Sequence, residues 1–168
     1  MKTFLGLGSN IEDRYYNLQK GIKYLTEHPH IWIINKSYVY QSPPMYYFEQ
    51  KDYYNMVLEI DTNLEPLDLL GILKDIEKKC GRKNNNNCKN MPRELDIDIL
   101  AIDSLFIRSN ILNIPHIAIC DRKFVLKPWN DIAPDYLISN LNKTVAELLK
   151  ETCDNSDLHM ILELKGNS

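Results

Sequence analysis

Short apolar runs alternate with longer amphipathic segments along the N-terminal two thirds of the chain. Four of the runs are rich in β-branched and aromatic residues and are predicted to be strands: residues 2–7, 31–40, 53–60 and 95–102. Two segments, residues 13–27 and 66–81, place apolar residues at helical spacing and are predicted to be helices. The resulting order, β-α-β-β-α-β, predicts an α+β fold with a ferredoxin-like core, in which helices cover one face of a mostly antiparallel sheet.

Capping and breaking residues set the expected ends of these elements. Ser9 and Glu12 have the spacing of a capping box just before the first predicted helix, which begins at about residue 13. Pro66 suits the first position of the second helix. The segment Ser42-Pro43-Pro44 must end the second strand, because proline has no amide hydrogen to donate to a neighbouring strand. Apolar residues in the segment 82–91 follow neither the helical nor the strand period, so this segment is predicted to be a loop.

The pattern beyond the fourth strand is weaker. Residues 107–114 are expected to form one short extra strand, and residues 121–130 a helix interrupted at Pro128. A second capping-box spacing opens a predicted helix over residues 144–151, and the tail after Cys153 shows little pattern. The core is therefore expected to carry a C-terminal helical extension.

The composition excludes several classes of protein. The 168 residues are 44% hydrophobic and 26% charged, which is typical of soluble globular chains, and residues 1–168 show no repeat or domain boundary. A net charge of −3 argues against a nucleic-acid partner, and no apolar run is long enough for a membrane span or a signal peptide. The four cysteines have no zinc-site spacing, which predicts free thiols in a cytoplasmic protein. Nothing in the chain requires more than a monomer.

The sharpest chemical signal is the acidic pair of the last predicted strand. Asp96 and Asp98 are two residues apart, so they share one face of the strand with α-carbons ~6.5–7 Å apart. Two carboxylates so close repel unless a cation lies between them, and hard oxygen ligands favour Mg²⁺. Such a pair can also bridge two ions ~3.5–4 Å apart. The alternative is a pair of solvated charges on the open face of an edge strand.

Cationic residues flank this acidic pair in the sequence. Arg82, Arg93, His116 and Arg122 together suggest a polyphosphate, because arginine matches phosphate oxygens in a bidentate geometry. Taken singly, Arg82 could be a charge at a helix end, His116 a turn residue and Arg122 a surface residue. The chain has neither a dinucleotide-binding glycine motif nor a P-loop, so metals and arginines would have to hold any bound ATP.

Several short motifs follow one another along the chain. They are Gly8-Ser9-Asn10, Tyr40-Gln41-Ser42-Pro43-Pro44, Tyr53-Tyr54-Asn55, Gly81-Arg82, Pro92-Arg93-Glu94-Leu95-Asp96-Ile97-Asp98-Ile99-Leu100, Pro115-His116 and Arg122-Lys123-Phe124. With these motifs, nearly the whole chain resembles the 6-hydroxymethyl-7,8-dihydropterin pyrophosphokinase family of the folate pathway. The resemblance implies the same ferredoxin-like fold. It also implies transfer of pyrophosphate from ATP to the hydroxymethyl oxygen of the pterin, with release of AMP.

The resemblance also implies a role for individual residues. Asp96 and Asp98 would hold two Mg²⁺ ions and, with Arg82 and Arg93, form the catalytic set. The residues expected at the nucleotide are Lys74, Glu77, Arg82, Arg93, Ile99, His116 and Arg122. The residues expected at the pterin are Ser42, Pro43, Pro44, Met45, Tyr53, Asn55 and Phe124.

The chain departs from the family pattern at a few positions. Asn90 and Met91 replace the usual Trp-Gly, Asn84 stands where a second basic residue is common, and Ile117 follows the histidine where the family often has an aromatic residue. None of these changes removes an expected metal ligand. They leave open a decayed family member that binds ATP but turns over slowly. The other alternative is a ferredoxin-like module that binds nucleotide or RNA without catalysing a reaction. The acidic pair and the net negative charge of the chain oppose it.

Overall fold

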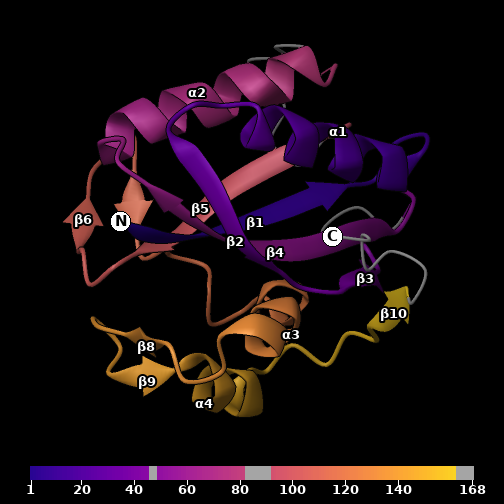
Figure 1. Cartoon of the computed structure of the whole chain (residues 1–168). Helices are drawn as coiled ribbons and strands as arrows, with labels where there is room; N and C mark the ends of the chain where they lie inside the picture. Colours follow the sequence, from indigo (N-terminus) through magenta and orange to yellow (C-terminus); the bar gives the residue numbers. More distant parts are fainter. Residues whose placement is uncertain (46–48, 82–91, 162–168) are drawn as a thin grey trace.

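The computed structural model describes residues 1–45, 49–81 and 92–161 (Figure 1). Its N-terminal part consists of β1 (Lys2–Ser9), α1 (Arg14–Thr26), β2 (Ile31–Lys36), β3 (Val39–Ser42), β4 (Tyr53–Thr62), α2 (Pro66–Lys79) and β5 (Asp96–Ile102). Its C-terminal part consists of β6 (Ile107–Arg108), β7 (Asn113–Ile114), α3 (Lys123–Ile132), β8 (Leu137–Ile138), β9 (Lys143–Thr144), α4 (Val145–Glu151) and β10 (His159–Ile161). No helix in the described ranges is long and apolar enough to cross a membrane.

One six-stranded sheet organises the molecule. Its strands follow the order β10-β3-β4-β1-β5, and β2 pairs with β4 on the same side as β3. Every pairing within this sheet is antiparallel. The central position of β1, between β4 and β5, follows from its nearly continuous burial on both faces. The predicted ferredoxin-like core of the α+β class is confirmed.

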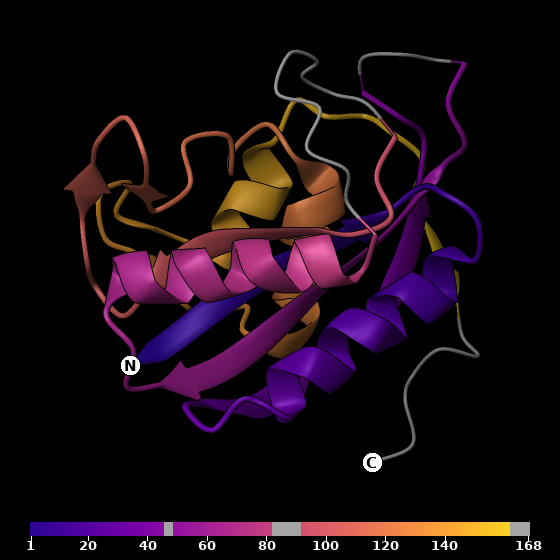
Figure 2. The same ribbon diagram turned by 90° about the horizontal axis from the view of Figure 1, so that it is seen from above.

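Helices cover both faces of the sheet (Figure 1). α1 and α2 lie side by side over one face, as Figure 2 shows from above, and enclose a core that includes Leu5, Leu73 and Ile97. α3 and α4 cover the other face, where Phe4 and Trp129 belong to a second core. Because successive strand residues point to opposite faces, Phe4 and Leu5 belong to different cores. The C-terminal extension therefore closes the face that a bare ferredoxin-like core would leave open.

Two predicted details of the N-terminal part are wrong. The first helix is capped by Asp13, whose carboxylate accepts a hydrogen bond from the Tyr16 amide at 2.9 Å. Ser9 is unavailable as a cap because β1 continues through it, and its hydroxyl accepts from Asn17 instead. The predicted single strand 31–40 is two strands, β2 and β3, because residues 37–38 between them are not in strand conformation. Both pair with β4, which explains their continuous strand-like sequence.

The C-terminal part differs from the prediction in its short elements. Residues 107–114 form a hairpin of two short strands, β6 and β7, rather than one strand. Pro128 lies inside α3 without interrupting it, since the buried side chains around it hold the helix although one backbone hydrogen bond is lost. The capping box at Thr144 is confirmed and opens α4. The predicted loop 82–91 lies outside the described residues.

Candidate active site

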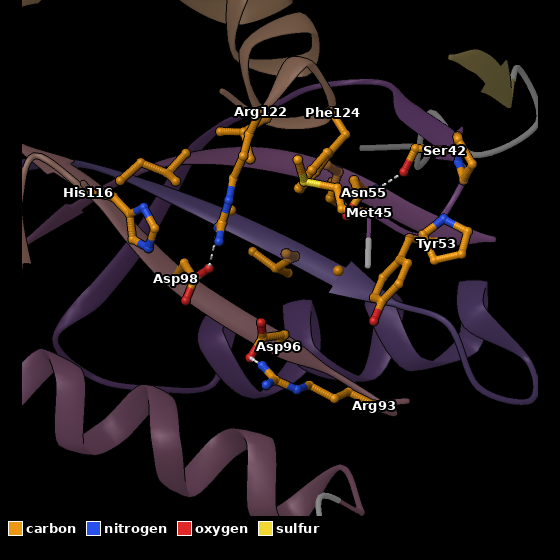
Figure 3. Close-up of a pocket in the computed structure, with 18 of the residues that line it drawn as sticks. Ser42, Met45, Tyr53, Asn55, Arg93, Asp96, Asp98, His116, Arg122 and Phe124 are labelled. Atoms are coloured by element: carbon orange, nitrogen blue, oxygen red, sulfur yellow. Dashed lines mark hydrogen bonds and ion pairs between the residues drawn. The ribbon is translucent and has the colours of Figure 1, made fainter. Parts of the chain in front are cut away.

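A pocket of about 320 Å³ lies between the sheet and the first turn of α3 (Figure 3). Its walls come from β1, β4, β5, α3 and the segments that follow β3 and precede β5. The residues that line it are Gly6, Leu7, Gly8, Ser42, Pro43, Pro44, Met45, Gln50, Tyr53, Asn55, Met56, Arg93, Asp96, Asp98, Leu100, His116, Arg122, Phe124 and Val125. The fold thus gathers most of the residues that the sequence singled out into one cavity.

The acidic pair lies on the pocket side of β5. Asp96 and Asp98 line the cavity, whereas Ile97 between them is fully buried in the opposite core. Each carboxylate already faces an arginine: Arg93 contacts Asp96 at 2.8 Å and Arg122 contacts Asp98 at 3.5 Å (Figure 3). The Asp96 and Asp98 side chains are 25% and 34% exposed, which does not fit two fully solvated charges.

The electrostatics of the pair favour a bound cation. Burial and the neighbouring Asp96 charge raise the pKa of Asp98, although His116, Lys74 and Arg122 act in the opposite direction. A raised carboxyl pKa means that the negative charge is not fully compensated by the protein. The described residues contain no cluster of three or more histidine, cysteine or acidic side chains that could hold a metal. An ion bound by two carboxylates and completed by water or phosphate oxygens fits Mg²⁺, which keeps several such ligands.

His116 is prepared to donate a hydrogen bond into the pocket. Its Nδ1 atom accepts a hydrogen bond from the Ala118 amide at 3.2 Å, so the neutral ring carries its hydrogen on Nε2. Burial lowers the pKa of His116, against the attraction of Asp98, and Arg122 lowers it further. Burial thus favours the neutral ring, which can donate from Nε2.

The opposite end of the pocket suits a flat polar ring. The Asn55 side-chain amide donates to the Ser42 hydroxyl at 2.8 Å, and both side chains are buried. Tyr53 and Phe124 add aromatic surface at this end (Figure 3). Gly8 has room for no side chain, because a Cβ atom there would lie 2.9 Å from the Asn55 Oδ1 atom. Pro43, Pro44 and Met45 complete the pterin set expected from the sequence, and all seven of its members line the cavity.

Part of the expected nucleotide set lies elsewhere. Glu77 is 1% exposed, and its Oε1 atom accepts hydrogen bonds from the Ile97 amide at 2.8 Å and from Lys74 at 2.9 Å. Ile99 is buried in the core beneath α1 and α2. None of the side chains of Lys74, Glu77 and Ile99 lines this pocket. Arg82 lies outside the described residues.

Asn10 joins two walls of the pocket and had been given no role from sequence. Its backbone amide donates to the Arg93 carbonyl at 3.1 Å, and its side-chain oxygen accepts from the Arg93 amide at 2.8 Å. Its side-chain amide donates to Gln50 at 2.9 Å. The motif Gly8-Ser9-Asn10 was the signal that could have pointed to Asn10 and to Gly8, whereas Gln50 lies in a segment without any pattern.

The chain is similar to several known proteins. The sequence model of the family described as 7,8-dihydro-6-hydroxymethylpterin-pyrophosphokinase matches residues 4–134. The chain is 36% identical over 148 residues to the 2-amino-4-hydroxy-6-hydroxymethyldihydropteridine pyrophosphokinase of Methylorubrum extorquens, covering 88% of the chain and 91% of that protein. It is 35% identical over 159 residues to the Folic acid synthesis protein FOL1 of Dictyostelium discoideum, covering 95% of the chain.

Some relatives are much longer than this chain. The match spans 24% of the Dictyostelium protein and 46% of the Bifunctional protein FolKE of Lactococcus lactis, which is 38% identical over 165 residues and covers 97% of this chain. Among solved structures, the HPPK-DHPS of Plasmodium falciparum with pteroate superposes with a TM-score of 0.69 at 20% identity, covering 89% of this chain and 42% of that one. At this identity the likeness shows the fold alone.

Proposed function

The chain belongs to the 7,8-dihydro-6-hydroxymethylpterin-pyrophosphokinase family, and we propose on that basis that it carries out the family's reaction. In this reaction ATP donates pyrophosphate to the hydroxymethyl oxygen of 6-hydroxymethyl-7,8-dihydropterin, which gives the pterin diphosphate and AMP for folate synthesis. The observation that carries the proposal is the single pocket that holds both an acidic pair and a buried amide flanked by aromatic rings.

The acidic end of the pocket suits the triphosphate. Asp96 and Asp98 would hold magnesium, for which we propose two ions. When bound, the metal neutralises charge on the phosphates as the bond between the α- and β-phosphates breaks. Arg93 and Arg122 can exchange their carboxylate partners for phosphate oxygens, and His116 can donate from Nε2. The protein's own contribution is therefore positioning and electrostatic stabilisation.

The other end of the pocket suits the pterin. Asn55 offers both a donor and an acceptor, which matches the donor–acceptor edge of a pterin ring. Its amide is oriented by the Ser42 hydroxyl, so this edge can be bound without side-chain rearrangement. Tyr53 and Phe124 supply aromatic surfaces for the two faces of the ring. The hydroxymethyl group would then point toward Asp96 and Asp98.

We further propose that the protein acts as a cytoplasmic monomer on these two small molecules, with no nucleic-acid or membrane partner. The departures from the family pattern keep a slow or inactive family member as the alternative. Of these departures, Ile117 is 68% exposed, and positions 84, 90 and 91 lie outside the described residues.

One assay tests the proposed function. Purified protein is mixed with ATP, MgCl₂ and the hydroxymethyl dihydropterin, and AMP and pterin diphosphate are quantified. Equal amounts of both products are expected, with ~100-fold slower formation by Asp98→Asn and normal amounts from Asp75→Asn, an exposed position on α2. Binding of both ligands without AMP formation would establish the inactive alternative. Failure to bind either ligand would refute the proposed function.

A further inference from the structure

The tail that follows α4 crosses the molecule to the far edge of the sheet. It leaves α4 after Glu151, passes the first turn of α3 and ends as β10 beside β3 (Figure 1). This segment lies beyond residues 4–134, the part of the chain that matches the family. The proposal below therefore concerns residues to which the family match assigns no role.

At α3 the tail supplies a missing helix cap. Arg122 is the N-cap residue of α3, but its side chain makes no capping hydrogen bond. Instead, the Asp154 carboxylate accepts a hydrogen bond from the Lys123 amide at 2.9 Å. The Lys123 ammonium group in turn donates to the Ser156 carbonyl at 2.9 Å. A carboxylate that satisfies a first-turn amide is the usual means of stabilising a helix start, and here it comes from a distant part of the chain.

The carboxylate of Asp154 is itself held in place. Its second oxygen accepts a hydrogen bond from the Ser156 amide at 2.9 Å. Partial burial acts to raise the pKa of Asp154, but the hydrogen bonds from Ser156 and Lys123 outweigh it and lower the pKa. The charged form is thus the one that the surrounding donors stabilise.

At its other end the tail is fixed to the sheet. β10 pairs with β3 in antiparallel register, with Met160 opposite Tyr40 and His159 opposite Gln41. The Tyr40 hydroxyl donates to Asp131 near the end of α3 at 2.8 Å. The tail therefore connects the first turn of α3 to the strand that ends at Ser42, and α3 is fixed at both of its ends.

These two attachment points flank the pterin end of the pocket. Lys123, whose amide Asp154 binds, lies between Arg122 and Phe124, and both of these neighbours line the pocket. Without a cap, the first turn of a helix frays, and a ligand must order it on binding. With the cap, Phe124 is in place before the ligand arrives.

We propose that Asp154 is a positioning residue for this pocket: it fixes the first turn of α3 and thereby the ring of Phe124. The identity of the ligand in this proposal rests on the proposed function. Asp154 itself does not line the pocket, so it acts through Lys123 and its neighbours.

Three variants of the full chain test the proposal by calorimetric titration with the pterin, in the presence of Mg²⁺ and a non-hydrolysable ATP analogue. Asp154→Ala should raise the pterin dissociation constant about fivefold to tenfold, the usual effect of a lost cap when ligand binding must restore it. Asp154→Asn should recover part of the lost binding, because its one side-chain oxygen can still accept from the Lys123 amide but not from the Ser156 amide as well. Asp157→Ala is the matched control, since Asp157 is exposed in the same tail, and should bind like the unchanged protein.

A double variant separates positioning from general stability. If Asp154 acts through Phe124, Asp154→Ala should have no further effect on pterin binding in a Phe124→Ala background. Equal effects in both backgrounds, or no recovery by Asp154→Asn, would overturn the proposal.

Hydrogen exchange of the ligand-free protein gives a readout that does not depend on the reaction. The Lys123 amide should exchange at least about tenfold faster in Asp154→Ala than in the unchanged protein. If the unchanged protein fails to bind pterin, the proposed function is refuted, whereas unchanged exchange at Lys123 refutes the role of Asp154.

Discussion

Asp98 and its neighbours show how single side chains prepare the pocket for a cation. Burial and the nearby Asp96 charge raise the pKa of Asp98, so Arg122 beside it compensates its charge only in part. The ligand-free protein therefore carries an electrostatic strain that a metal ion would relieve.

Asp98→Asn should separate stability from activity. The amide keeps the shape of the side chain but removes the charge, so the thermal midpoint of the ligand-free protein at pH 7 should rise. Turnover should fall by ~100-fold or more, as when one electrostatic contact to the reacting phosphates is lost. Calorimetry and AMP release measure the two effects. A variant with near-normal turnover would contradict the assignment of Asp98 as a metal ligand.

Asn55 should discriminate between the two substrates. Asn55→Ala removes the buried amide and leaves polar atoms of the ring unpaired, which costs ~1–3 kcal/mol of pterin binding energy. Binding of ATP should change little, because the Asp96 end of the pocket is untouched. Titration with each ligand measures this, with Asn35→Ala on the exposed side of β2 as control. Equal weakening of both ligands would mean that Asn55 only supports the fold.

At the scale of elements, the site depends on how closely α1 packs on the segment before β5. Gly21 in α1 faces Leu95, the residue that precedes Asp96, and a Cβ atom at position 21 would lie 2.6 Å from Leu95 Cδ2. Leu95 is fully buried, so it has little room to move. This contact fixes the start of the strand that carries the acidic pair.

Two glycine substitutions in helices should therefore have opposite effects. Gly71→Ala places its methyl group in open space on α2 and should stabilise the protein by up to about 1 kcal/mol. Gly21→Ala gains the same helix propensity but crowds Leu95, so a net loss of about 1–2 kcal/mol is expected. Urea denaturation measures both free energies of unfolding. A stabilising Gly21→Ala would show that α1 can move away from Leu95.

Asn10 holds together two segments that lie on either side of the pocket. Asn10→Ala removes the side-chain bonds to Arg93 and Gln50, which should cost ~1–3 kcal/mol of stability. Because Arg93 then loses its fixed position, kcat/KM should fall by at least about tenfold. Asn10→Asp keeps the acceptor for the Arg93 amide and should recover most of the lost stability and most of the lost kcat/KM. If Asn10→Ala retains normal kcat/KM at a temperature where it is folded, the link to Arg93 has no catalytic importance.

The sequence predicted the elements whose apolar residues recur at regular spacing, and the site residues that lie within them. The core strands and helices were predicted because each places a regular apolar face inward, and the shared face of Asp96 and Asp98 follows from the two-residue period of a strand. Strands such as β8 and β10 were missed, since two or three residues show no period. The hydrogen bonds of Asn10 to Arg93 and of Asp154 to Lys123 could not be predicted, because they join segments far apart in the chain.

At the scale of the whole molecule, the pocket depends on nearly the entire fold. Its residues extend from Gly6 to Val125, and they meet only because β1 pairs with both β4 and β5 while α3 packs over the sheet. The second helical layer forms one wall of the pocket, so the C-terminal extension is part of the site. The fold without α3 would lack Arg122 and Phe124.

The paired charges of the pocket have a consequence for the kinetics of encounter. Arg93 and Arg122 are matched by Asp96 and Asp98, so these four side chains have no net charge in a chain of net charge −3. Such a site exerts little long-range pull on a triphosphate, whereas strongly steered association falls steeply with salt. The association rate constant of magnesium-bound ATP in stopped flow should thus vary by less than about threefold as salt rises from about 0.05 to 0.5 M. A decline of more than about tenfold would show that the site attracts its ligand from a distance. With weak steering, discrimination among nucleotides resides in how long each one stays once the arginines have exchanged their carboxylate partners for phosphate.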